Sequence, residues 1–252
     1  MVEGDFFMPT IYLSPSTQEF NPYSGGGNEE QYMNLVADAM VPYLNASGIG
    51  YVRNTPDMTA STSITASNNG NYDLHLALHS NASGNGNGQI RGAEFYYYPS
   101  SQNGLRAAEI FANNFKLIYP IPQNVRTVAT TTLGEVRRTK APAILAEIAY
   151  HDNPDDANWI RENVDLIAEN LVVSLTDYFG IPFNTPTPGS ETVVVSTPFG
   201  GNLNIREQPS ITSNILGVIP NGTQIISYYN TGQWSFIRYG QLTGYVNNNY
   251  II

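Results

Sequence analysis

The sequence predicts two domains, an α/β domain with a largely parallel sheet and a small all-β barrel after it. Strand-like and helix-like patterns alternate over residues 10–179, which is typical of a parallel sheet flanked by helices. Prolines and small polar residues then favour an extended spacer at 181–192. The rest of the chain consists of short apolar runs separated by Gly, Pro and Asn, a pattern typical of a small barrel. We therefore expect domains at 8–181 and 193–252, joined by a linker at 182–192.

The hydrophobic pattern predicts each element of the first domain. Residues 10–14 are a short apolar run, as expected for a strand. From Asn28, a good N-cap, apolar side chains recur every three or four residues until Gly48, which predicts a helix with a kink at Pro42. Further strands are expected at 49–53, 72–79, 93–99 and 141–150, and further helices at 105–118 and 155–179.

The second domain is predicted strand by strand in the same way. Its apolar runs lie at 203–207, 215–220, 221–229, 234–239 and 243–246. Neither domain contains an internal repeat, and their patterns differ in kind, so we expect two unrelated folds.

The composition excludes several classes of partner and site. The chain has 252 residues and a net charge of −10, so neither nucleic acid nor an anionic membrane surface is expected to bind it. It has no cysteine, which excludes disulfides and thiolate chemistry and leaves His, Asp, Glu or a neutral oxygen as metal ligands. No run of about 18 apolar residues predicts a membrane span. Residues 1–13 lack the features of a signal peptide.

Polar side chains follow or interrupt the predicted buried strands. His79 ends one strand, Glu147 lies within the apolar run of another, and His151 follows it. Because ligands gather beyond the carboxyl ends of parallel strands, we expect these groups to lie in one site. Burial should raise the pKa of Glu147 towards that of a general base, and the alternative is a structural ion pair with Arg137 or Arg138.

Two of the three histidines lie on one predicted strand. His75 precedes His79 by four residues, about 13 Å at the rise of a strand, which is too far to bind the same ion. His79 has the position of a metal ligand at the strand end, whereas His75 is expected to pack in the core.

Three stretches occur in this order along the chain: DLHLALHSNASG, RGAEFYYYPSS and VRRTKAPAILAEIAYHDNPDDANWI. Together they resemble the zinc-dependent N-acetylmuramoyl-L-alanine amidase family, in its type 3 branch, over about residues 10–181. The resemblance implies a Rossmann-like α/β fold and hydrolysis of the amide between the lactyl group of N-acetylmuramic acid and the L-alanine of the stem peptide. It also implies a zinc ion held by His, Glu and His, with a further Glu as the catalytic residue.

The resemblance assigns roles to individual residues. Glu147 corresponds to the catalytic glutamate, the base of a zinc-assisted hydrolysis, and His79 corresponds to the second zinc histidine. Alignment on the first helix places the zinc glutamate at Glu29, with Glu30 as the alternative one residue on. Arg137 is a candidate for binding a carboxylate of the stem peptide, and its alternative role is that of a solvated surface residue.

The first zinc histidine of the family is absent from this chain. Its place reads PSTQ, residues 15–18. We expect His151 to replace it, because imidazole suits zinc better than an amide, with Gln18 or Glu19 as the alternative. Since a zinc ion that carries a water molecule needs three protein ligands, the expected metal site is Glu29, His79 and His151. Without a replacement, the site would bind zinc weakly or not at all.

The second domain resembles the bacterial SH3 (SH3b) domain, through LNIREQPS and through WSFIRYG followed by GYV. This resemblance spans about residues 193–252 and implies a module that binds cell-wall peptides and holds an attached hydrolase at its substrate. Trp234, Tyr228 and Tyr229 are candidates for a shallow groove, although core packing is the simpler role for Trp234.

We therefore expect a monomeric peptidoglycan hydrolase that acts outside the cell at the cell wall, either as an autolysin or as a phage endolysin. Its substrate would be the glycan strand with its stem peptides, and its cofactor zinc. Two alternatives stay open, a non-catalytic wall-binding protein with a degenerate zinc site and a zinc peptidase acting on wall peptides. The presence of Glu29, His79 and Glu147 favours the enzyme.

Overall fold

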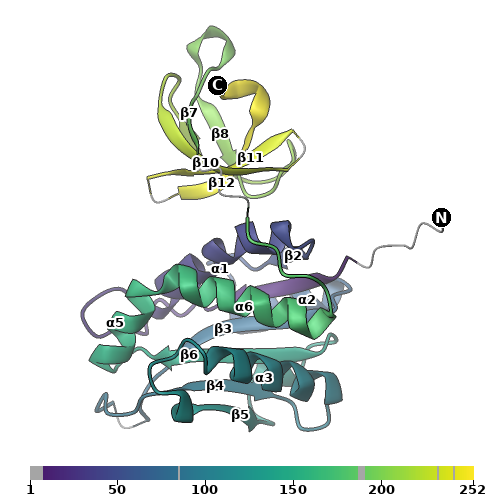
Figure 1. Ribbon diagram of the computed structural model, residues 1–252, viewed down its shortest axis with the longest axis vertical. Coiled ribbons are helices and arrows are strands. Elements are labelled where there is room, and N and C mark those ends of the chain that lie inside the picture. Colours follow the sequence, from purple (N-terminus) through teal and green to yellow (C-terminus); the bar gives the residue numbers. More distant parts are fainter. Residues whose placement is uncertain (1–7, 85, 187–190, 232, 241) are drawn as a thin grey trace, which may run out of the picture. The chain divides into compact units, whose positions relative to one another are not determined.

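The computed structural model describes residues 8–84, 86–186, 191–231, 233–240 and 242–252. The chain divides into two units at the boundary between Asn184 and Thr185, which we call unit 1 and unit 2 (Figure 1). Residues 1–7 and 187–190 lie outside the described residues, and with them parts of the predicted N-terminal and linker segments.

Unit 1 contains a six-stranded sheet in the order β2-β1-β3-β6-β4-β5. Neighbouring strands run parallel, except β4 and β6, which are antiparallel, so the prediction of a largely parallel sheet is confirmed. The short edge strand β5 is absent from the predicted elements. The strands are β1 (Thr10–Pro15), β2 (Gly50–Arg53), β3 (Leu74–Asn81), β4 (Ala93–Tyr97), β5 (Val125–Ala129) and β6 (Ala143–Tyr150).

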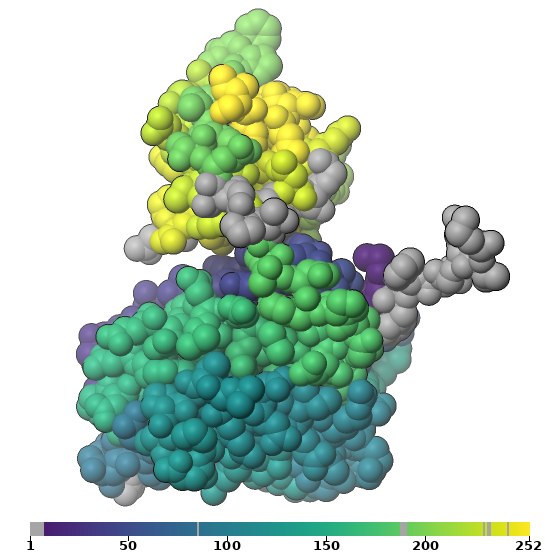
Figure 2. Space-filling view, viewed as in Figure 1, coloured from purple at the N-terminus to yellow at the C-terminus, as the bar shows by residue number. Residues whose placement is uncertain are grey.

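Helices cover both faces of this sheet. They are α1 (Glu29–Ala46), α2 (Ala60–Asn69), α3 (Gln102–Phe115), α4 (Gly134–Arg137), α5 (Pro154–Glu162) and α6 (Val164–Phe179), with a short 3₁₀ helix η1 (Pro122–Asn124). On one face α1, α3, α5 and α6 pack around the large apolar core, and α3, α5 and α6 form a continuous layer in the space-filling view (Figure 2). On the other face lie α2 and α4, where Val136 packs with Ala77 and Leu145. None of the described helices is both long and apolar enough to cross a membrane.

The helix termini follow the sequence with one exception. The side chain of Asn28 caps α1, because its oxygen accepts a hydrogen bond from the first turn at 2.8 Å. The helix continues through Pro42 and is followed by Gly48, whose φ of +72° favours glycine. The helix predicted at 155–179 is instead two helices, because Asn163 leaves helical geometry with a φ of −125° and separates α5 from α6.

The pleat of the sheet decides where the polar side chains of the strands point. Successive residues of a strand face opposite sides, and Leu76 and Leu78 of β3 point into the large core. His79 therefore points to the other face, the one covered by α2 and α4. In β6, Glu147 shares this face with Leu145. The two predicted functional residues thus emerge on the same side of the sheet.

Unit 2 is a six-stranded antiparallel sheet in the order β7-β10-β11-β12-β8-β9, which confirms the predicted all-β fold. Ile205, Ile237 and Val246 lie in its apolar core. Its first strand starts at Glu191, within the predicted linker, because it pairs with β10. The elements are β7 (Glu191–Val194), η2 (Pro198–Gly200), β8 (Leu203–Arg206), β9 (Ile215–Ile219), β10 (Gln224–Thr231), β11 (Trp234–Tyr239), β12 (Leu242–Asn247) and η3 (Asn248–Tyr250).

Candidate active site

His79 lies near the end of β3 between two buried carboxylates. Its Nδ1 is 2.8 Å from Oε1 of Glu29, and its Nε2 is 3.1 Å from Oε2 of Glu135. All three residues are buried. Burial by itself lowers the pKa of His79, but the hydrogen bonds to the two carboxylates raise it well above its ordinary value. Without a metal ion the ring is therefore an imidazolium that donates to both carboxylates.

Glu29 reaches His79 from the start of α1. It follows the N-cap directly, and the residue is 1% exposed. The Asn21 amide donates to its Oε2 at 2.6 Å. Burial raises the pKa of Glu29, but the hydrogen bond to His79 outweighs this effect, and the pKa lies below its ordinary value. Of the two alternatives at the helix start, the structure brings Glu29 to His79, whereas Glu30 is partly exposed.

Glu135 is a further buried carboxylate of the site, and no pattern in the sequence predicts it. Its Oε1 is 3.2 Å from Nε2 of His75 and accepts a hydrogen bond from Oγ of Ser14 at 2.6 Å. Burial raises the pKa of Glu135, but its contacts with His75 and His79 hold it well below the ordinary range. His75 itself is buried and its Nδ1 lies 2.9 Å from Oγ of Ser67, as expected for a core histidine. Glu135 sits in the single turn of α4, where no periodic pattern marks it.

Glu147 lies beside His79 in the sheet. The two residues pair in register between β3 and β6 and point to the same face. Oε2 of Glu147 is buried and has no hydrogen-bond partner among the described residues. Burial raises the pKa of Glu147 to about 7, against the opposing effect of the nearby His79. A carboxylate that titrates near neutral pH, with an oxygen that has no partner, meets the requirements of a general base.

A second carboxylate continues this row on the far side of Glu147. Glu94 of β4 pairs in register with Glu147. Its Oε1 accepts from Nε of Arg126 at 2.8 Å, and its Oε2 accepts from the hydroxyl of Tyr96 and from the amide of Asn81 at 3.1 Å. Arg126 balances the charge of Glu94. The negative charge of Glu94 still contributes to the raised pKa of Glu147.

Gln18 is the second polar group close to Nδ1 of His79. Its amide nitrogen lies 3.2 Å from that atom, while Oε1 of Glu29 lies 2.8 Å from it. A four-coordinate zinc ion with bonds of about 2.0–2.1 Å spaces its ligands about 3.3 Å apart, which is close to the separation of Gln18 and wider than that of Glu29. Rotation of the amide by half a turn presents its oxygen at the same place, in exchange for the hydrogen bond that Oε1 accepts from Nδ2 of Asn21 at 3.2 Å. Glu29, His79 and Gln18 therefore fit a zinc ion, with two strong donors and one weak donor.

His151 is not brought into this group. Its Nδ1 lies 2.8 Å from the backbone oxygen of Ser80 and 3.1 Å from its Oγ, and its ring stacks on Tyr23. Ser80 and His79 are successive residues of β3, so their side chains point to opposite faces of the sheet. Within the described part of the chain, no three His, Asp or Glu side chains are grouped to hold a metal ion. The predicted set of Glu29, His79 and His151 is thus not assembled.

Arg137 also lies apart from the row of His79 and Glu147. It is exposed and lines a separate pocket with Pro142 and Ala143, at the start of β6. Glu147 is four residues further along that strand, about 13 Å at the rise of a strand. The structure therefore does not support the predicted contact of Arg137 with a substrate carboxylate at the site.

A cleft of about 570 Å³ opens beside His79 and Glu135. Its other walls are the end of β1 with the loop after it, at residues 14–20, and the segment from β2 to the start of α2, with Asn54 and residues 56–60. Its volume is in the range of ligand sites, about 300–1,000 Å³. A substrate in this cleft would reach the face of the sheet that carries His79.

We expect Glu147 to make the stability of the metal-free protein depend on pH. Its pKa rises from 4.5 to about 7 on folding, so the folded state binds more protons between these values. The free energy of unfolding therefore falls as the pH rises through this range. Glu147→Gln should stabilise the protein by up to about 3 kcal/mol above about pH 8 and have little effect below about pH 4.

Urea unfolding in the presence of a chelator measures this difference. Glu109→Gln, which changes an exposed glutamate of α3, is the matched control and should leave the free energy of unfolding unchanged at both pH values. A Glu147→Gln variant that gains no stability at high pH would refute a carboxylate whose buried Oε2 has no partner.

Comparison with known proteins relates unit 1 to amidases and unit 2 to the bacterial SH3 domain. The family model described as N-acetylmuramoyl-L-alanine amidase matches residues 17–177, and that of the bacterial SH3 domain matches residues 201–252. The chain is 28% identical over 162 residues to the N-acetylmuramoyl-L-alanine amidase LytC of Bacillus subtilis. This match covers 62% of the chain and 32% of LytC, so the chain spans about a third of the length of that relative.

Several solved structures share the fold of unit 1. AmiC2 of Nostoc punctiforme, an N-acetylmuramoyl-L-alanine amidase, superposes with a TM-score of 0.62 at 19% identity, covering 69% of this chain and 98% of AmiC2. Cwp6 from Clostridium difficile has a TM-score of 0.58 at 25% identity, covering 68% of this chain and 29% of Cwp6. The match to AmiC2 shows the fold alone.

Proposed function

This chain belongs to the N-acetylmuramoyl-L-alanine amidase family, and on that premise we propose that it hydrolyses the amide between the lactyl group of N-acetylmuramic acid and the L-alanine of the peptidoglycan stem peptide. The observation that carries the proposal is the pairing of His79 and Glu147 in register, with Glu29 bonded to His79. This arrangement combines two proposed metal ligands with a carboxyl group whose pKa is about 7.

Zinc is the cofactor that we propose for this site, held by Glu29, His79 and Gln18. When bound there, it would polarise the scissile carbonyl and acidify a water molecule. Glu135 accepts a hydrogen bond from Nε2–H of His79 and so keeps Nδ1 directed towards Glu29 and Gln18. Oε2 of Glu147, which has no partner among the described residues, takes the proton of the attacking water and delivers it to the departing amine of L-alanine.

Unit 2 is proposed to hold the enzyme at the cell wall, outside the cell. A bound module raises the effective concentration of unit 1 at its substrate without taking part in the chemistry. We propose that the chain acts as a monomer, because each unit has its own core and the candidate site is built from unit 1 alone.

Digestion of purified peptidoglycan by the full chain tests the proposed reaction. We expect free stem peptides with a new N-terminal L-alanine, detected by amino-group labelling and mass spectrometry, without new reducing sugar ends. New amino groups on residues other than L-alanine would indicate a peptidase. Binding to the wall with no product at all would indicate a non-catalytic wall-binding protein.

Removal of unit 2, Thr185–Ile252, should separate targeting from chemistry. The shortened chain should fold, because the two cores share no residue. Its activity on intact walls should fall by about 10²-fold or more, as expected for loss of a linked binding module. Its activity on soluble muropeptides should stay close to that of the full chain. An equal loss on both substrates would mean that unit 2 helps to build the active site.

A further inference from the structure

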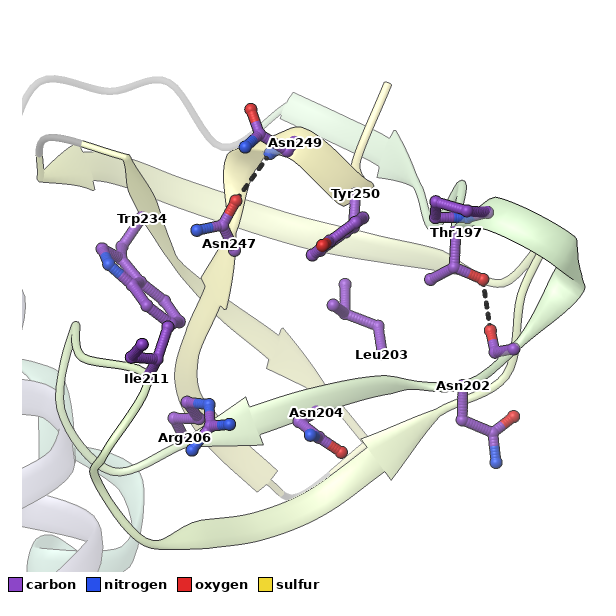
Figure 3. A pocket seen from close by; sticks show the side chains of 12 residues that line it. Thr197, Asn202, Leu203, Asn204, Arg206, Ile211, Trp234, Asn247, Asn249 and Tyr250 are labelled. Atoms are coloured by element: carbon purple, nitrogen blue, oxygen red, sulfur yellow. Dashed lines mark hydrogen bonds between the residues drawn. The ribbon is translucent and has the colours of Figure 1, made fainter.

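Unit 2 carries a groove of about 450 Å³ on its surface (Figure 3). Trp234 and Tyr250 contribute aromatic rings to it, and Asn204 and Asn247 contribute amides. Trp234 at the start of β11 pairs with Asn247 at the end of β12, and Tyr250 follows in η3. Of the predicted groove residues, Trp234 lines it, whereas Tyr228 packs near Phe236 instead; the Tyr229 side chain lies outside the described residues.

Local hydrogen bonds hold the groove in shape. Oδ1 of Asn247 accepts from the backbone N–H of Asn249 at 3.0 Å and closes the turn that carries Tyr250 (Figure 3). At the other end, the hydroxyl of Thr197 donates to the carbonyl of Gly201. The side-chain N–H groups of Asn247 and the amide of Asn204 form no hydrogen bond with any described residue. These amides are therefore free to pair with a ligand.

The groove is close to electrically neutral. Unit 2 contains two acidic residues, Glu191 and Glu207, and two arginines, Arg206 and Arg238. Of these, Arg206 lines the groove, and its Nη1 already donates to the carbonyl of Ser213 at 2.8 Å. Neither Glu191 nor Glu207 lines the groove, so an ammonium group bound there would meet no carboxylate. A ligand with several carboxylates would meet one guanidinium that is partly engaged, so burial of its charges would be costly.

Two aromatic rings and unpaired amides suit a sugar. The C–H face of a pyranose ring is apolar and flat enough to pack on Trp234 or Tyr250. Hydroxyl and acetamido groups pair with side-chain amides, which both donate and accept hydrogen bonds. The volume of the groove falls within the range of ligand sites, about 300–1,000 Å³.

We propose that this groove binds the glycan strand of the wall, a polymer of N-acetylated amino sugars, and not the stem peptide. This inference rests on the proposed function, because the proposed action on peptidoglycan identifies the sugar as that of the glycan strand. Hydrolysis by unit 1 detaches the stem peptide and leaves the glycan intact, so the reaction does not destroy the binding sites of unit 2. The enzyme can thus stay on a strand that it has already processed.

Titration of the full chain carrying Glu147→Gln with the tetramer of N-acetylglucosamine tests the proposal. Isothermal calorimetry should show binding, weakened at least about tenfold by Trp234→Ala and by Tyr250→Ala. Tyr250 is 37% exposed, so its replacement spares the core if Trp234→Ala disturbs the fold. The matched control is Phe199→Ala, which removes a fully exposed ring of the same unit that does not line the groove.

The stem peptide supplies the opposing test. A soluble tripeptide, L-Ala-D-Glu-L-Lys, should not compete with the tetrasaccharide for the groove. Equal amounts of the chain should sediment with walls before and after removal of the stem peptides from those walls. Competition by the tripeptide, or loss of binding after peptide removal, would overturn the proposal. Tetrasaccharide binding by a chain that releases no stem peptides would instead refute the proposed hydrolysis and leave this inference standing.

Discussion

Glu147→Gln is expected to lower the rate of stem-peptide release by about 10²–10⁴-fold, the usual contribution of a general base. Glutamine keeps the shape of the side chain but cannot accept the proton of the attacking water. Glu147 contacts neither Gln18 nor Glu29 through a hydrogen bond among the described residues, so zinc content should stay unchanged. The loss should appear in kcat, because the base acts in the chemical step.

Release of N-terminal L-alanine from soluble muropeptides is the appropriate measurement, since unit 2 does not limit it. Glu109→Gln serves again as the exposed control and should keep full activity. A Glu147→Gln enzyme that retains more than about a tenth of the normal rate would assign the base to another group. Glu94, next in the same row, would then be the residue to test.

The fold was predictable where hydrophobic patterns are strong. The strands β3 and β6 are continuous apolar runs, and α1 shows a clear apolar stripe with Asn28 as its cap. Helix α2 has no such stripe, because Ile64 is its one large apolar side chain. Its start depends instead on a capping box formed by Thr59 and Thr62. The antiparallel placement of β4 beside β6 depends on long-range pairing, which no local pattern encodes.

The candidate site was predictable to the same extent. His79 and Glu147 interrupt apolar runs, and the strands that carry them bury the His79 side chain and one carboxylate oxygen of Glu147. Glu135 could not be found in this way, because its role depends on α4 placing its carboxylate between His75 and His79, 60 and 56 positions away in the chain. The assignment of His151 followed the preference of zinc for imidazole. In the structure His151 contacts Ser80, and the pleat of β3 places Ser80 and His79 on opposite faces of the sheet.

The second large effect is expected at the third zinc donor. Gln18→Ala should weaken zinc binding by at least about 10–100-fold, because loss of even an indirect partner of a metal site typically costs that much. Gln18→His should strengthen it, since imidazole is a better zinc ligand than an amide. His79→Ala, which removes a strong donor, should cause the greatest loss of the series.

These affinities are measurable on the full chain by competition with a chromophoric chelator, without any assay of activity. His151→Ala leaves the proposed zinc donors in place, so it should change zinc affinity by less than about threefold. Because His151 is buried against Tyr23, its loss also removes packing. His151→Phe keeps an aromatic ring at this position and separates the two effects.

The comparison of Gln18 with His151 decides how the chain compensates for the missing family histidine. The structure places the Gln18 amide 3.2 Å from Nδ1 of His79 and engages Nδ1 of His151 with Ser80. A site that loses zinc on Gln18→Ala but keeps it on His151→Phe would mean that the first strand retained its ligand in altered form. If His151→Phe empties the site while Gln18→Ala leaves it filled, His151 must reach the metal by its other ring nitrogen. The hydrogen bond of His151 to Ser80 would then orient a ligand instead of holding a core side chain.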